Sequence, residues 1–72
     1  MTRTQIRLDT MSDVNKFVSV MTGLKEQVWL EDDDGNRVSA KSLLGALYSL
    51  EWNRIYCYCD VDIASKLMPW MV

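Results

Sequence analysis

Residues 27–50, which read QVWLEDDDGNRVSAKSLLGALYSL, decide the fold of this chain. Apolar and polar residues alternate over residues 27–31 and again over residues 37–40, which is typical of strands that bury one face. The segment between them, residues 32–36, is acidic and contains glycine, a composition typical of turns. We therefore predict a β-hairpin made of these three segments.

A helix is predicted directly after this hairpin. Ser42 is a residue type favoured at a helix N-cap, where its hydroxyl can accept a hydrogen bond from a free backbone N–H. The apolar residues that follow have the spacing of a short amphipathic helix: Leu43, Leu44, Leu47 and Leu50.

The residues before the hairpin predict one strand and one helix. Polar and apolar residues alternate over residues 3–8, which indicates a half-buried strand. A helix is expected from about residue 12 to residue 22. Its apolar residues fall on one stripe: Val14, Phe17, Val18 and Met21. Gly23 is expected to end this helix in the left-handed conformation.

The C-terminal part predicts a fourth strand over residues 54–61 and a short last helix. One face of this strand should carry Ile55, Cys57, Cys59 and Val61, and the other Tyr56, Tyr58 and Asp60. Asp62 can cap the last helix, and Pro69 should end it. Its apolar side chains are Ile63, Leu67 and Met68. Residues 67–72 should close the open end of the core; alternatively, the last four residues project outward as an apolar tail and form a dimer contact.

These elements follow the order β-α-β-β-α-β-α. We predict an α+β fold, a two-layer open-faced sandwich in which three helices cover one face of a four-stranded antiparallel sheet. With 72 residues, the chain has room for a single domain, residues 1–72.

The composition argues against most catalytic classes. The chain contains no histidine, which removes His-based nucleophilic triads, His-ligated zinc and phosphohistidine chemistry. A chain this short needs its apolar residues for packing and has few to spare for a deep active site. We therefore expect a non-enzymatic binding or regulatory protein that needs no cofactor.

The charge pattern argues against direct binding to nucleic acid. Eight Lys and Arg against ten Asp and Glu give a net charge of −2, and the basic residues are scattered. The longest apolar run, Ile55 to Cys59, has five residues, far fewer than the ~20 that cross a bilayer. No secretory signal is evident near the N-terminus, so we expect a cytoplasmic protein without membrane contact.

Two further motifs have simple structural interpretations. Cys57 and Cys59 lie two apart on a strand, where their side chains splay, so reduced core thiols are favoured over a redox or metal pair. Asp32-Asp33-Asp34-Gly35 superficially suggests calcium. An EF-hand loop would need ligands where Leu30 and Lys41 stand, so a solvated turn is favoured and no metal site is predicted.

Residues 38–45, VSAKSLLG, resemble the V-N-A-K-S-I-M-G segment of the HPr family, the small phosphocarrier proteins of the bacterial sugar phosphotransferase system. Residues 48–50, YSL, are similar to the M-S-L of that family. Residues 17–18 and the strand at 28–30 also match its spacing. The resemblance covers nearly the whole chain and agrees with the element order above.

The chain departs from this family at the phosphoryl-accepting segment. The family reads G-L-H-A-R-P where this chain reads LDTMSD, residues 8–13. Thr10 falls at the position of the phospho-acceptor histidine, and Ser12 at that of the arginine. A threonine hydroxyl is too weak a nucleophile without a base, and phosphothreonine is too stable to pass its phosphate on. The chain looks like a histidine-less subgroup; a phosphotransferase component with another acceptor is the alternative.

Ser42 matches the family. In Gram-positive members, the serine at this place is phosphorylated by a dedicated kinase, and the phosphoprotein docks onto a transcriptional repressor. The resemblance therefore implies a seryl kinase or a transcriptional regulator as protein partner. We predict a docking surface formed by Ser42, Leu43 and Leu47. The simpler alternative is that Ser42 serves only as a helix N-cap.

The face of the sheet that the helices leave uncovered should be rich in aromatic and basic residues. It should carry Trp29, Tyr56 and Tyr58 beside Arg3, Arg7 and Arg37, together with Gln5, Glu31 and Ser39. Such a face can bind a partner or form a weak homodimer, because Trp, Tyr and Arg dominate binding hot spots. Alternatively, the arginine stems only cover the rings.

Overall fold

The computed structural model describes residues 2–72 and has the predicted order of elements. The elements are β1 (Thr2–Ile6), α1 (Met11–Thr22), β2 (Val28–Glu31), β3 (Arg37–Ser39), α2 (Leu43–Ser49), β4 (Ile55–Cys59), α3 (Ala64–Leu67) and the 3-10 turn η1 (Met68–Trp70). The strands form one sheet in the order β1-β4-β2-β3, and all neighbours are antiparallel. The predicted α+β fold is confirmed.

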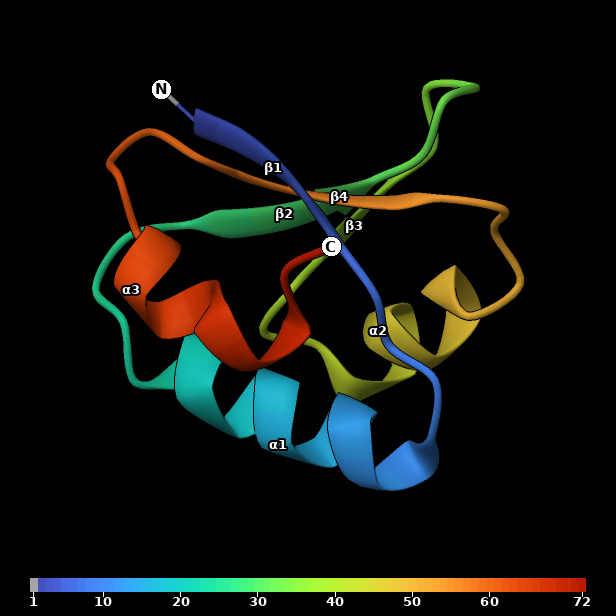
Figure 1. The fold of residues 1–72 in the computed structure, drawn as a ribbon, viewed down its shortest axis with the longest axis horizontal. Helices are drawn as coiled ribbons and strands as arrows, with labels where there is room; N and C mark the ends of the chain where they lie inside the picture. Colours follow the sequence, from blue (N-terminus) through green and yellow to red (C-terminus); the bar gives the residue numbers. More distant parts are fainter. Residues whose placement is uncertain (1) are drawn as a thin grey trace.

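The helices all lie on one side of the sheet, and the other side is left open (Figure 1). The core fills the space between the two layers. Along β4, Ile55, Cys57 and Cys59 are buried, as the alternation predicts. The helices contribute Val14, Phe17, Met21, Ala46 and Leu67 to the same cluster.

The prediction for Val61 was wrong. β4 ends at Cys59, and Val61 is 44% exposed. The chain turns there toward α3, where Asp62 accepts a hydrogen bond from the Ala64 N–H at 2.9 Å. The alternation of side chains holds only while the strand is paired, so it fails beyond the last pair, Thr2 with Cys59.

Helix α1 begins one residue earlier than predicted because Thr10 is its N-cap. The Thr10 hydroxyl accepts from the Asp13 N–H at 3.1 Å, and the Asp13 carboxylate accepts from the Thr10 N–H at 3.2 Å. This reciprocal pair is a capping box. The expectation for Gly23 was wrong, since its φ of −74° is right-handed. Its N–H still bonds the Val20 carbonyl at 3.2 Å and closes the last turn.

The acidic segment after β2 is a turn organised by one carboxylate. Asp32 is buried and accepts the N–H groups of Asp34 and Asn36 at 3.0 and 2.8 Å, and the Asn36 amide at 2.6 Å. These bonds, led by the one from the Asn36 side chain, hold the pKa of Asp32 below its ordinary value against the opposing effect of burial. Gly35, with φ of +89°, completes the reversal.

The C-terminal segment closes one end of the core. Helix α3 ends at Leu67, before Pro69 as predicted, and Pro69 lies in the first turn of η1, where its missing N–H is not needed. Trp70 is buried, as expected of a segment that closes the core, whereas Met68 is 69% exposed and the prediction for it was wrong. The segment also runs along the outer edge of β1 through an Ile6–Met71 bridge. Among residues 2–72, no helix combines the length and apolar character needed to cross a bilayer.

Candidate partner-binding surfaces

Ser42 occupies the N-cap of α2, as predicted. Its backbone is extended, with φ of −100°, and its Oγ accepts a hydrogen bond from the Gly45 N–H at 3.1 Å. The Ser42 carbonyl accepts the first helical bond, from Ala46 at 2.9 Å. The hydroxyl therefore satisfies one of the free N–H groups at the start of the helix.

Gly45 lets α2 lie close to β3. A Cβ at this position would stand 3.1 Å from the Val38 Cβ and 3.3 Å from the Ser39 carbonyl oxygen. Both distances are tighter than ordinary van der Waals contact, and one of the atoms belongs to the backbone. The first turn of the helix can therefore approach the edge strand only because residue 45 has no side chain.

The first turns of α2 expose large apolar side chains. Leu43, Leu44 and Tyr48 are 44%, 79% and 58% exposed, and Leu47 is half-buried. A groove of about 620 Å³ runs between this helix and β3, and its lining includes Val38, Ser42, Leu44, Leu47 and Tyr48. We call Ser42, Leu43, Leu44, Leu47 and Tyr48 the α2 surface. Adjacent exposed apolar side chains of this kind are typical of interaction sites.

The sequence pattern identifies three members of the α2 surface, Ser42, Leu43 and Leu47. It does not identify Leu44, which it assigns to the apolar stripe of the helix, or Tyr48. Positions 44 and 48 are four apart, so they lie on the same side of the helix, and this side faces solvent. The buried side of α2 is centred on Ala46 and Ser49, so Leu44 and Tyr48 lie roughly opposite to it.

Lys41 lies next to Ser42 in the chain, but its ammonium group is held elsewhere. Its Nζ donates to the Leu24 carbonyl at 2.6 Å, which ties the start of α2 to the end of α1. The lysine thus supports the position of the helix. Added negative charge on Ser42 would stand beside the leucines of the α2 surface.

The open face of the sheet brings together the predicted aromatic and basic residues. The Arg3 guanidinium lies 3.8 Å from the centre of the Tyr56 ring. The Arg37 guanidinium lies 5.2 Å from the ring centres of Trp29 and of Tyr58. These distances are those of cation–π contacts. We call these five residues the aromatic face.

Glu31 joins the two arginines of the aromatic face. Its carboxylate pairs with Arg3 Nε at 3.3 Å and also accepts from the Arg37 guanidinium. The arginines therefore lie over the rings and share one carboxylate, which offsets one of their two positive charges. Burial is the main effect that raises the pKa of Tyr58. The face covers its own aromatic rings, which makes it a weaker candidate for docking than the α2 surface.

Arg7 is separate from the aromatic face. It follows the last residue of β1, and its Nε donates to the Asp9 carboxylate at 3.1 Å. Its backbone N–H bonds the Trp70 carbonyl at 2.8 Å. Beyond Ile6 the chain pairs with the C-terminal segment instead of β4, so the alternation no longer places Arg7 beside Tyr56 and Tyr58.

Thr10, at the position of the family's phospho-acceptor, lies at the start of α1. Its hydroxyl is used in the capping box with Asp13, and the same carboxylate also accepts the Asp9 N–H at 3.1 Å. These contacts stabilise the helix start. The groups around Thr10 are the Asp13 carboxylate and the backbone N–H groups that bond to it and to the Thr10 hydroxyl.

Comparison with known proteins finds no matching family model, curated protein or solved structure for this chain. The candidate surfaces are therefore argued from their own residues and geometry.

The two cysteines are free and buried side by side on β4. Burial, and secondarily the neighbouring Cys59, raises the pKa of the Cys57 thiol to about 12. A thiol with such a pKa is protonated at neutral pH and reacts slowly as a nucleophile. Within residues 2–72, no group of three or more Cys, Asp or Glu side chains is arranged to hold a metal ion.

Proposed function

We propose that this chain is a non-catalytic, HPr-like regulatory protein of the cytoplasm that docks onto a protein partner through the α2 surface. The observation that carries the proposal is the exposure of Leu43, Leu44 and Tyr48 around the N-cap serine of α2. The resemblance of residues 38–45 to the HPr family supports the same surface.

The chemistry of the surface suits a partner with an apolar binding site. The side chains of Leu44 and Tyr48 flank a groove whose exposed wall is largely apolar. Covering such side chains gains about 25 cal/mol per Å² of apolar area. By the resemblance, the partner is a transcriptional regulator, and a seryl kinase controls docking by phosphorylating Ser42.

A phosphate on Ser42 would add close to two negative charges beside Leu43 and Leu44. The docked partner would then meet an anion surrounded by apolar side chains, which an arginine flanked by apolar residues recognises well. The Gly45 N–H, which now binds the Ser42 hydroxyl, would remain available to a phosphate oxygen.

The first experiment tests modification. The purified chain is incubated with an HPr-family seryl kinase and labelled ATP, together with the variants Ser42→Ala and Ser12→Ala. Ser12 is an exposed serine near the start of α1 and serves as the control. We expect label in the wild type and in Ser12→Ala and none in Ser42→Ala. Equal labelling of wild type and Ser42→Ala, or none in either, contradicts control at Ser42.

The second experiment tests docking. Calorimetric titration of the phosphorylated chain with a repressor that binds phosphorylated HPr should give measurable affinity. Leu44→Asp should abolish it, whereas Met68→Asp, which charges a comparably exposed residue on η1, should leave it unchanged. If Leu44→Asp binds as well as the wild type, the α2 surface is not the docking site. Transfer of phosphate from phosphoenolpyruvate through this chain to an acceptor would favour the carrier alternative.

A further inference from the structure

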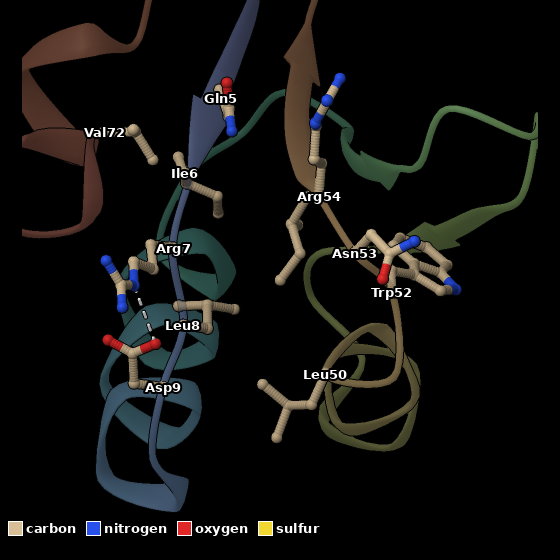
Figure 2. Close-up of a pocket in the computed structure, with 11 residues that line it drawn as sticks. Gln5, Ile6, Arg7, Leu8, Asp9, Leu50, Trp52, Asn53, Arg54 and Val72 are labelled. Atoms are coloured by element: carbon tan, nitrogen blue, oxygen red, sulfur yellow. Dashed lines mark hydrogen bonds and ion pairs between the residues drawn. The ribbon is translucent and has the colours of Figure 1, made fainter.

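The two outer strands of the sheet, β1 and β3, are protected differently. The C-terminal segment covers part of β1, where the Val72 N–H donates to the Gln5 carbonyl at 3.3 Å. Figure 2 shows Val72 and Arg54 on opposite sides of β1. Within residues 2–72, β3 pairs only with β2, and no segment covers its outer edge. An uncovered edge of this kind can pair with a strand of another chain.

The outer edge of β3 presents backbone groups of Arg37 and Ser39. The Ala40 N–H bonds the Val28 carbonyl at 2.9 Å, so position 40 is directed toward β2. Because backbone groups alternate along a strand, Val38 is also directed toward β2, whereas Arg37 and Ser39 point outward. Within residues 2–72, the Ser39 carbonyl accepts one loop N–H at 3.2 Å and keeps a second lone pair, and the other outward groups have no protein partner.

The apolar groove between α2 and β3 lies beside this edge. Gly45 is close to β3, since a Cβ there would stand 3.1 Å from the Val38 Cβ. Tyr48 is three residues after Gly45 and four after Leu44, so these residues share one side of the helix. All of them line the groove of about 620 Å³. A strand added to β3 would therefore lie above an apolar groove.

The two ends of β3 carry opposite charges. The turn that precedes the strand exposes Asp33 and Asp34. Lys41 follows the strand, and its Nζ donates to the Leu24 carbonyl at 2.6 Å, so the exposed Lys25, next in the chain, lies at the same end. When two copies of β3 pair antiparallel, the acidic end of each meets the basic end of the other. A second copy of this chain is therefore complementary in charge to the edge.

We propose that two copies of this chain pair antiparallel through β3 and form one continuous sheet. Arg37 of each copy exchanges hydrogen bonds with Ser39 of the other, and the two Val38 residues meet at the twofold axis. This register keeps the like-charged arginines from standing opposite each other. Below the sheet, Leu44 and Tyr48 of each copy pack into the groove of the other. The pair covers part of the α2 surface, so it competes with the docking proposed above but does not depend on it.

Sedimentation equilibrium of the unmodified chain tests the pairing. From about 10 µM to about 1 mM, we expect a monomer–dimer equilibrium with a dissociation constant of about 0.1 mM or below. Leu44→Asp should raise this constant at least about tenfold, whereas Met68→Asp, on η1, should leave it unchanged. A wild type that stays monomeric at about 1 mM, or a Leu44→Asp variant that dimerises equally well, would overturn the proposal. No partner protein is present, so this failure leaves the docking function untouched.

A reversal of charge tests the antiparallel arrangement. Asp34→Lys should weaken the dimer by about tenfold, because the contact between acidic and basic ends occurs twice in each dimer. Asp9→Lys makes the same change of charge far from β3, where Asp9 forms an exposed pair with Arg7 (Figure 2), and should leave the dimer unchanged. Equal effects of the two variants would contradict the placement of the charged ends.

Amide hydrogen exchange locates the interface on β3. The N–H groups of Arg37 and Ser39 should exchange at least about fourfold more slowly at about 1 mM than at about 10 µM protein, as expected from the change in the monomer fraction. The Val38 N–H is bonded within the sheet and should be protected at both concentrations. If the chain dimerises while exchange at Arg37 and Ser39 does not depend on concentration, β3 is not the interface.

Discussion

The Trp70 indole meets the Phe17 ring edge to face, with 5.2 Å between the ring centroids and 86° between the ring planes. Phe17 lies at the centre of α1, and Trp70 ends η1, so the contact joins the first helix to the last turn. Both side chains are buried. The C-terminal segment is thereby held in the core by one large aromatic side chain.

Replacing Trp70 by alanine should therefore lower the free energy of unfolding by about 3–5 kcal/mol, the usual cost of removing a large buried aromatic side chain. The neighbour Met71 is 43% exposed, so Met71→Ala should cost far less. Urea denaturation of the two variants checks this prediction. Similar midpoints for both would show that the C-terminal segment is not part of the cooperative core.

Gly45→Ala should destabilise the protein by about 1–3 kcal/mol, because its Cβ would crowd Val38 and the Ser39 backbone. Shortening the neighbour, in Val38→Ala, should recover part of that loss in the double variant. Gly23→Ala is the matched control. Its Cβ would lie at an ordinary 3.5 Å from the Val20 carbonyl oxygen, and its φ is negative. That substitution should leave stability unchanged or raise it by about 0.4–1 kcal/mol. A harmless Gly45→Ala would contradict the close approach of α2 to β3.

Ser42→Ala should lower the free energy of unfolding by about 0.5–2 kcal/mol, since it removes the acceptor of the Gly45 N–H. Ser42→Asp should retain most of the stability, because aspartate is an equally good N-cap. Guanidinium unfolding of the three proteins separates this capping role from any role in docking. An unchanged midpoint for Ser42→Ala would contradict the observed start of α2.

Asp32 should make the protein sensitive to acid. Its pKa is lowered in the folded protein, mainly by the Asn36 side chain, so the carboxylate stabilises the fold fully above the unfolded pKa of ~3.9. This contribution is lost as the pH falls through the lower folded pKa. The stability difference between wild type and Asp32→Asn should therefore shrink below about pH 4. Urea midpoints measured from neutral to acid pH test this, with the exposed neighbour Asp34→Asn as control. If the stability difference between wild type and Asp32→Asn stays constant with pH, the charge of Asp32 does not contribute to the stability of the fold.

Cys57 should resist alkylation in the folded protein. It is buried, and its pKa of about 12 leaves almost no thiolate at pH 8. Iodoacetamide followed by mass spectrometry should find the cysteines unmodified under native conditions and modified in denaturant. Rapid native labelling at Cys57 would mean that β4 opens readily.

Several features of the fold follow from local patterns in the chain. The alternation in β4 predicts the buried side of Ile55, Cys57 and Cys59, and a serine before leucines predicts the N-cap of α2. Such patterns report which side of one element is apolar, and burial follows from that. The same reasoning fails at Val61 and Met68, where apolar residues lie at the ends of their elements and the path of the chain decides their exposure.

The sequence by itself determined the order of the elements, the helix cap at Ser42, and the turn at residues 32–36, because each depends on side chains within a few residues of one another. Only the tertiary structure decided that Leu44 and Tyr48 share an exposed groove with Val38 and that Arg7 leaves the aromatic face. These relationships join segments far apart in the chain. Their geometry depends on where paired strands separate and how closely a helix can approach the sheet, which local periodicity does not encode.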